Sequence, residues 1–282
     1  MKWKVSKRQK LVVFLQSCLE PSPSGKVLRR ALEANLCRVN GKVERFGSAE
    51  VKEGAIVELS DDWNKSLSES ALSIPVVYED EYLLIVNKPA GWVCTDEQCK
   101  KAFGSKTALI HRLDKETTGL LLIAKTNAAR IAMIELFKEH KIEKLYFALV
   151  DGVPEKDHGI KESLLTKVGT FEGQTRYGSR AHGQFAKTHW KVLAKGKQAA
   201  LLACQPVTGR THQIRVHLAE LGHPILVDRQ YAERFRCKYF AKRPLLHAAR
   251  LKFIHPITHH PIDLEQKPPA DFQLAMKELV NK

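Results

Sequence analysis

The sequence has no apolar run approaching the 18 or so residues that a membrane-spanning helix requires. Its first residues are basic and include a short apolar patch, Leu11–Leu15, but no clear small-residue cleavage site follows. We therefore predict neither a transmembrane helix nor a signal peptide, and no membrane partner.

Cysteine occurs without the spacing that would give it a structural or metal-binding role. None of the six cysteines belongs to a CxxC pair; they are Cys18, Cys37, Cys94, Cys99, Cys204 and Cys237. In a chain of 282 residues this scatter is typical of reduced thiols, which predicts a cytoplasmic protein. Neither His111 nor the pair His259–His260 has a partner at metal-ligand spacing, so we predict no metal site.

The patterns of nucleotide and metal chemistry are missing as well. Neither GxxxxGKS/T nor GxGxxG occurs, which argues against a nucleotide-dependent enzyme. No glycine-rich candidate for a methyl-donor site is present, which argues against an RNA methyltransferase. The carboxylates do not cluster in a basic context, as a metal-dependent nuclease would require.

Positive charge is abundant throughout the chain. Lysine and arginine number 46 against 31 acidic residues, giving a formal net charge of +15, and residues 1–62 alone hold 12 basic and 8 acidic residues. A distributed excess of this kind favours a polyanion as partner and salt-dependent binding. Charge alone is also compatible with a basic protein that binds no polyanion.

The pattern of apolar and turn residues divides the chain into two domains. We predict a small domain over 1–62, a polar, serine-rich linker over 63–73 and a large domain over 74–282. In the small domain we expect helices over 7–19 and 24–34, an Asn-Gly hairpin over 36–43 and a strand over 56–59. In the large domain we expect helices over 127–138 and 211–221, a polar loop over 169–183, and strands at 75–86 (a pair), 120–124, 145–150, 188–193, 200–204, 251–254 and 262–264.

Residues 111–126, HRLDKETTGLLLIAKT, form the stretch with the clearest chemical character. Asp114 lies between Arg112 and Lys115, and cations on both sides favour the charged form of a carboxylate. Residues 117–119 suggest a turn, so we expect Asp114 on a loop ahead of the buried strand. A carboxylate there could act as nucleophile or base; on this stretch alone, it could equally cap a turn and pair with Arg112.

Residues 8–60 resemble the small RNA-binding domain shared with ribosomal protein S-four. The resemblance rests on a helix followed by a basic second helix, then the VNGK hairpin at 39–42 and KEGAIVEL at 52–59. It implies an α/β domain that contacts RNA through basic side chains. These are Lys26, Arg29, Arg30, Arg38 and Lys42.

From Ile74 to about Phe272 the chain resembles the RluA family of pseudouridine synthases. The motifs occur in the family's order: NKPAG at 87–91, HRLDKETTGLLLIAKT at 111–126, KLYFALVDG at 144–152, AKT at 186–188, TGRTHQIRVHLA at 208–219, LHA at 246–248 and HP at 255–256. The resemblance implies an α+β domain whose central sheet is mixed and largely antiparallel, with flanking helices and loops. It also implies an isomerase that converts uridine in RNA to its carbon-linked isomer.

The resemblance implies roles for individual residues. Asp114 is the catalytic carboxylate, as nucleophile or as base on the sugar, and Arg215 pairs with it. Tyr146 stacks on the target base, and its phenol could help remove the carbon 5 proton. The remaining substrate-binding residues are Arg112, which would insert where the uridine leaves the stack, Leu246 as a pocket wall, and Lys88, Arg210, His212 and Gln213.

Isomerisation requires no redox partner or group donor, so we predict no cofactor. We expect a monomer that acts on large-subunit ribosomal RNA; the alternatives are transfer RNA as substrate, or a non-catalytic RNA-binding ribosome assembly factor. One position departs from the family pattern, since Val227 stands where glycine is usual before Asp228. Because valine adopts a positive φ only at a cost, we expect an effect on that loop.

Overall fold

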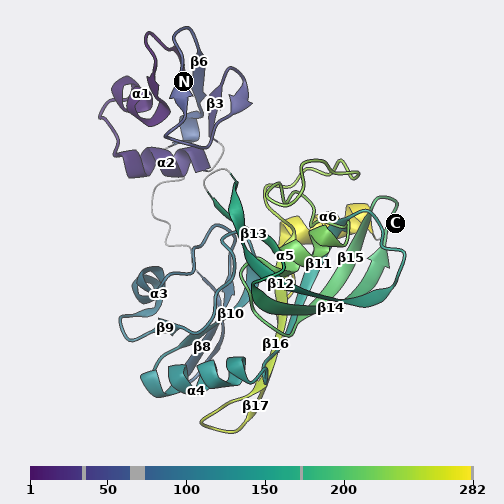
Figure 1. The fold of residues 1–282 in the computed structure, drawn as a ribbon. Helices are drawn as coiled ribbons and strands as arrows, with labels where there is room; N and C mark the ends of the chain where they lie inside the picture. Colours follow the sequence, from purple (N-terminus) through teal and green to yellow (C-terminus); the bar gives the residue numbers. More distant parts are fainter. Residues whose placement is uncertain (34–35, 64–73, 172–173, 281–282) are drawn as a thin grey trace. The chain divides into compact units, whose positions relative to one another are not determined.

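The computed structural model describes residues 1–33, 36–63, 74–171 and 174–280. They form two compact units, Met1–Ser73 and Ile74–Lys282, shown in Figure 1. Apart from Trp63, the predicted linker over 63–73 lies outside the described residues. No described helix is both long enough and apolar enough to cross a membrane.

The first unit consists of short elements around one apolar core. Its helices are α1 (Leu11–Cys18), α2 (Gly25–Glu33) and the 3-10 helix η1 (Asp61–Trp63), and its strands are β1 (Lys2–Lys4), β2 (Gln9–Lys10), β3 (Cys37–Val39), β4 (Lys42–Val43), β5 (Glu50–Val51) and β6 (Ile56–Leu59). The main sheet has the order β1-β6-β3-β4. Asn40 and Gly41 turn the β3–β4 hairpin with φ of 51° and 77°, as the Asn-Gly pair predicts.

The second unit is built on a sheet of 11 strands. The strands are β7 (Val76–Glu79), β8 (Leu83–Lys88), β9 (Ala108–Leu109), β10 (Thr118–Ala124), β11 (Glu143–Asp151), β12 (His158–Phe171), β13 (Gln174–Ser179), β14 (Gln184–Lys195), β15 (Ala199–Pro206), β16 (Leu246–Ile254) and β17 (Pro261–Glu265). The order is β13-β12-β14-β15-β11-β16-β10-β8-β7, with β17 beside β16 and β9 beside β10. β10 and β16 are parallel and the other described pairs are antiparallel, which confirms the predicted sheet.

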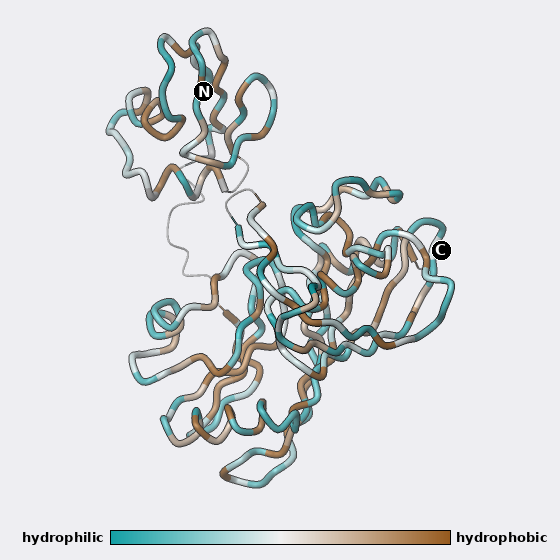
Figure 2. Tube along the Cα trace, viewed as in Figure 1, coloured by the Kyte–Doolittle hydropathy of each residue, from teal (hydrophilic) through white to brown (hydrophobic). Residues whose placement is uncertain are grey.

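Both faces of β8 and β10 are covered. Alternate residues of these strands enter two separate cores, one with α4 (Asn127–Lys138) and one with Trp92 and α3 (Asp96–Phe103). Figure 2 accordingly shows continuous hydrophobic colour along these strands. Two-sided burial explains why Leu120–Ala124 is apolar at every position. Elsewhere on the sheet lie α5 (Gln213–Glu220) and α6 (Ala270–Leu279) (Figure 1).

Some expectations about elements were wrong. The loop expected over 169–183 was wrong for much of its length, because the end of β12 and the whole of β13 lie there and their polar residues pair as strands. The turn expected over 117–119 lies earlier, at Lys115 and Glu116, and β10 already begins at Thr118. The helix expected from Thr211 begins at Gln213, because His212 has a left-handed backbone with φ of 57°. Neither α3 nor α6 was predicted.

Candidate active site

Asp114 lies on the loop that leads into β10. Its carbonyl oxygen accepts a hydrogen bond from Thr117 N at 3.0 Å, which closes the turn before the strand. The neighbouring Leu113 is buried and anchors the loop in the core beside β10. The Asp114 side chain remains partly exposed, at 26%. A rigid strand therefore presents a carboxylate that a ligand can reach.

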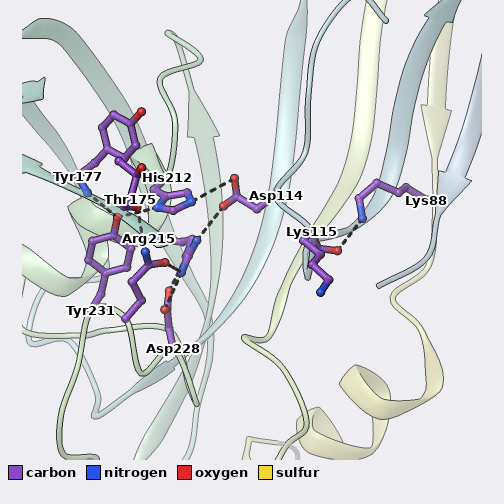
Figure 3. Close-up of polar contacts among 10 residues, drawn as sticks. Lys88, Asp114, Lys115, Thr175, Tyr177, His212, Arg215, Asp228 and Tyr231 are labelled. Carbon is purple, nitrogen blue, oxygen red and sulfur yellow. Dashed lines mark hydrogen bonds and ion pairs between the residues drawn. The ribbon is translucent and has the colours of Figure 1, made fainter. Parts of the chain in front are cut away.

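Lys88 holds this loop from behind. Its side chain is fully buried, and its ammonium group donates hydrogen bonds to the carbonyl oxygens of Pro89, Trp92 and Lys115 at 2.8–2.9 Å. Burial lowers the pKa of Lys88 to about 8. Because these three carbonyl groups use its donors, Lys88 positions the loop of Asp114 through Lys115 (Figure 3) and is not among the residues that line the cavity.

Arg215, on α5, connects the loop to the rest of the site. Its Nη1 donates to Asp114 Oδ2 at 3.2 Å, and its Nε and Nη2 form a bidentate pair with Asp228 at 2.6 and 2.9 Å. Nη2 also donates to Gln230 Oε1 at 2.7 Å. Burial opposes the charge of Arg215, but the hydrogen bonds and charge of Asp228 raise its pKa above the usual value. A permanent cation therefore orients the Asp114 carboxylate.

His212 approaches the other oxygen of the same carboxylate, with Nε2 lying 3.8 Å from Asp114 Oδ1 (Figure 3). The Tyr231 hydroxyl accepts from Tyr177 N at 3.1 Å and lies 2.7 Å from His212 Nδ1. Burial lowers the pKa of His212 and raises that of Tyr231 to about 12, so both are neutral at pH 7. Tyr231 then donates to Nδ1, which leaves the imidazole proton on Nε2, facing Asp114.

Tyr146 reaches the site through an irregularity in β11. The register between β11 and β16 shifts between Leu145 and Tyr146, and such a bulge redirects the side chains that follow it. Burial, and to a smaller degree the charge of Asp114, raises the pKa of Tyr146. The neutral phenol suits the stacking role expected from the sequence, whereas a tyrosinate base for the carbon 5 proton is disfavoured.

These side chains surround a cavity of about 850 Å³ in the second unit. Of the predicted residues there, all but Lys88 line it: Arg112, Asp114, Tyr146, Arg210, His212, Gln213, Arg215 and Leu246. Arg112 is exposed, whereas Leu246 is buried in the core against which Tyr146 packs. The cavity thus combines an oriented carboxylate with the ring of Tyr146 and the apolar side chain of Leu246.

Gln213 and Arg210 shape the rim of the cavity. The Gln213 amide oxygen accepts from Thr208 Oγ1 at 2.6 Å and from Arg210 N at 3.0 Å. Its amide nitrogen donates to Lys187 O and to Thr188 Oγ1. Gln213 is therefore committed to holding the turn. Arg210 donates from Nε to Phe185 O at 3.0 Å, and its side chain is exposed where it lines the cavity.

The sequence did not identify Asp228, Gln230 and Tyr231 as part of the site. Val227, the residue noted as unusual, has φ of 66°, the conformation that glycine adopts freely and valine only at a cost. The next residue, Asp228, pairs with Arg215. The signal in the sequence was therefore the position of Val227, which marks the strained turn that directs Asp228.

The first unit contains the predicted RNA-binding residues. Arg29, Arg38 and Lys42 are exposed there. The side chains of Lys26 and Arg30 lie outside the described part of the structure. Among the described residues, no group of three or more histidine, cysteine, aspartate or glutamate side chains is arranged to hold a metal ion.

The fold places one carboxylate, held by Arg215, in the wall of a cavity that Tyr146 and Leu246 also line. A family model described as RNA pseudouridylate synthase matches residues 82–220. The chain is 33% identical over 234 residues to ribosomal large subunit pseudouridine synthase D of Zymomonas mobilis, covering 74% of each chain. It is 32% identical over 285 residues to the enzyme of the same name from Pasteurella multocida, covering 90% of this chain and 86% of that one.

The structure of human RNA pseudouridylate synthase domain containing 4 superposes with a TM-score of 0.61 at 27% identity, covering 74% of this chain and 94% of that one. Together, the matches show that this chain belongs to the RNA pseudouridylate synthase family. Its reaction is accordingly an isomerisation of uridine in RNA, as the motifs predicted.

Proposed function

We propose that this enzyme converts one or a few uridines of large-subunit ribosomal RNA to pseudouridine, with Asp114 as its catalytic residue. The observation that carries the proposal is the contact of Arg215 with Asp114 at the wall of a cavity that also exposes Tyr146. Relatives named for the ribosomal large subunit support the choice of RNA. The positive charge of the chain agrees with a polyanionic substrate.

In the proposed reaction the bond between ribose carbon 1 and uracil nitrogen 1 breaks, the base turns, and its carbon 5 bonds to carbon 1. Asp114 acts at the sugar, as nucleophile on carbon 1 or as base, and Arg215 holds its carboxylate in position. Tyr146 stacks on the uracil while it turns. Carbon 5 finally loses its proton, and nitrogen 1, released from the ribose, gains one, so reactant and product have the same composition.

The target base must leave its stack before it can enter the cavity. Arg112 is exposed at the cavity and can fill the space that the base vacates. Arg210 and His212 contact the flipped nucleotide, and Leu246 forms the apolar wall. Since an isomerisation neither adds nor removes atoms or electrons, the proposed reaction proceeds without a cofactor. The proposed location is the cytoplasm. The proposed unit is a monomer, because one chain supplies all these residues.

Deleting the gene and mapping pseudouridines in all RNAs by chemical labelling and primer extension tests the proposal. One or a few sites should vanish from large-subunit ribosomal RNA and return with the wild-type gene but not with Asp114→Asn. Loss of sites from transfer RNA alone would contradict the choice of substrate. If no site is lost, the purified enzyme is incubated with unmodified ribosomal RNA, and absence of pseudouridine there would contradict the activity.

A further inference from the structure

The segment between Asp228 and Leu246 has a composition that the proposed reaction does not explain. Residues 229–243, RQYAERFRCKYFAKR, contain six cations, four aromatic residues and a single acid. The segment connects two parts of the active site, since Asp228 binds Arg215 and Leu246 lines the cavity. The yellow-green part of the ribbon in Figure 1 follows it near α5 and α6.

Exposure alternates along this segment although it forms no strand. The inward side chains pack in the core beneath α6; they are Phe235, Cys237, Tyr239 and Ala241. The outward side chains are all exposed and constitute what we call the outer row: Arg234, Arg236, Lys238, Phe240 and Lys242. The outer row therefore presents four cations and one aromatic ring from a segment whose inner side is fixed by packing.

Hydrogen bonds hold the segment in place at two points. The buried carboxylate of Asp151 accepts from Arg236 N at 2.9 Å and from Cys237 N at 2.7 Å. Near the other end, Arg243 forms a bidentate pair with Asp271 of α6 at 2.8 and 3.0 Å. A segment anchored in this way loses little conformational freedom when a ligand binds to it.

The outer row combines an exposed aromatic ring with cations that lack ion-pair partners in the described part of the chain. Phe240 is 80% exposed, the largest value for a large hydrophobic side chain in the described residues. Within that part of the chain, none of the four cations of the outer row forms an ion pair. An unpaired nucleic acid strand satisfies both, because its bases stack on aromatic rings and its phosphates pair with cations.

We propose that the outer row binds an unpaired stretch of RNA, with one base stacked on Phe240 and the flanking phosphates on Lys238 and Lys242. This extends the proposed function, on which it rests, by a second contact outside the uridine cavity. A duplex would not expose a base face to Phe240, so a single-stranded segment is the ligand that fits.

The test measures binding of the full-length protein to a labelled oligocytidylate of about 12 nucleotides by fluorescence anisotropy. This probe contains no uridine and so cannot be turned over. Phe240→Ala should raise Kd by about 5- to 150-fold, the range expected for loss of one stacked base, and Phe240→Trp should bind like wild type. Leu274→Ala is the matched control, since it removes an exposed apolar side chain of α6 and should leave Kd unchanged.

The charged part of the outer row is tested by a salt series. The double variant Lys238→Gln, Lys242→Gln should make the slope of log K against log salt shallower by about 1.4, two phosphates at 0.7 each. A Phe240→Ala Kd within twofold of wild type, or equal losses for Phe240→Ala and Phe240→Trp, would overturn the proposal. The binding assay does not depend on turnover. If Phe240→Ala weakens binding as expected but the enzyme modifies no ribosomal RNA, the proposed function is refuted and the outer-row proposal stands.

Discussion

At the scale of single residues, the site depends on how Arg215 distributes its hydrogen bonds. One guanidinium contacts Asp114, Asp228 and Gln230, and it also lies over the Tyr231 ring at 5.0 Å. Asp228 is almost fully buried and takes the stronger, bidentate share of the contact. Asp228 thus fixes the guanidinium, and Nη1 is directed at the Asp114 carboxylate.

Asp228→Asn should therefore damage both stability and activity. Removing the charge of Asp228 leaves the buried Arg215 with the longer contact to the partly exposed Asp114. Breaking a buried pair in this way typically costs about 3–5 kcal/mol. Denaturant titration measures this loss, and Asp263→Asn is the matched control. Asp263 pairs with Arg250 at 2.5 Å with both side chains about 40% exposed, so that change should cost below about 1 kcal/mol. Similar losses in the two variants would show that burial of the Arg215 pair is unimportant.

Sequence patterns located most of the cavity but not its supporting contacts. Asp114, Tyr146 and Arg215 could be predicted because they lie in motifs that occur in the same order as in the family. Lys88 belongs to such a motif too, yet its role depends on carbonyl groups up to 27 residues away. The pairing of Arg215 with Asp228 likewise depends on a turn that no local pattern specifies.

At the scale of elements, the parallel pairing of β10 with β16 positions the loop that carries Asp114. Gly119 has φ of 108° and lies opposite Ala248, where a Cβ atom would come within 2.2 Å of the Ala248 carbonyl oxygen. Next to it, Thr118 Oγ1 contacts His247 Nδ1 at 2.9 Å. Only glycine allows the two backbones this approach, five residues after Asp114.

Gly119→Ala should destabilise the fold by about 2–5 kcal/mol, the sum of overpacking and a left-handed backbone. Gly104→Ala is the matched control, because Gly104 has a similar φ of 103° but open space around the new Cβ. It should cost only about 1–2 kcal/mol, the backbone contribution. Thermal and urea unfolding compare the two, and equal losses would contradict the close contact of β10 with β16.

A buried histidine makes the packing of α5 sensitive to acid. His217 is fully buried, with Nδ1 2.9 Å from Thr188 Oγ1 and Nε2 3.0 Å from Ser163 Oγ, and burial lowers its pKa to about 4. An unfolded histidine titrates near about 6.5. Between these values only the unfolded chain binds the proton, so this stability is complete above pH 6.5 and lost as pH falls toward 4.

As the pH falls from about 6.5 toward 4, the free energy of unfolding should therefore decrease by about 1.4 kcal/mol per pH unit because of His217. Urea titrations at several pH values measure the slope. In His217→Gln the slope should be smaller by that amount, whatever the loss of stability at neutral pH. His260→Gln, which alters an exposed histidine, should keep the wild-type slope; an unchanged slope in His217→Gln would contradict a neutral His217.

Elements with strong periodicity could be predicted and others could not. The helix over 127–138 matches α4, and the apolar runs match β10, β11 and β15 within a few residues. The β12–β13 hairpin was missed because it is rich in polar residues along much of its length, which removes the apolar signal. The helix α6 was missed because only Phe272 and Ala275 are buried, too few to mark a face.

At the scale of the whole molecule, each unit has a core of its own. The core of the first unit includes Leu11, Leu15, Leu28 and Val57, and all its members lie between residues 3 and 63. The catalytic cavity draws on residues 94–246 alone. The proposed chemistry of the second unit and the proposed RNA contacts of the first unit can therefore be separated by cutting the chain between the units.

Removing residues 1–73 should leave a folded second unit with weaker binding to ribosomal RNA. The slope of log K against log salt should become shallower by about 0.7–0.9 for each phosphate that the shortened protein no longer binds. Circular dichroism checks the fold, and dissociation constants across a salt series give the slope. A truncated protein with the full-length slope would show that Arg29, Arg38 and Lys42 do not contact phosphates.

The most direct test of the proposed catalysis is single-turnover kinetics of Asp114→Asn. The asparagine keeps the shape of the side chain but removes its charge, so the variant should fold and bind ribosomal RNA. Its rate of pseudouridine formation should fall by about 10⁴-fold or more, as is usual for an essential catalytic group. A variant that folds, binds RNA and retains about a tenth of the wild-type rate, far above that expectation, would contradict the role of Asp114.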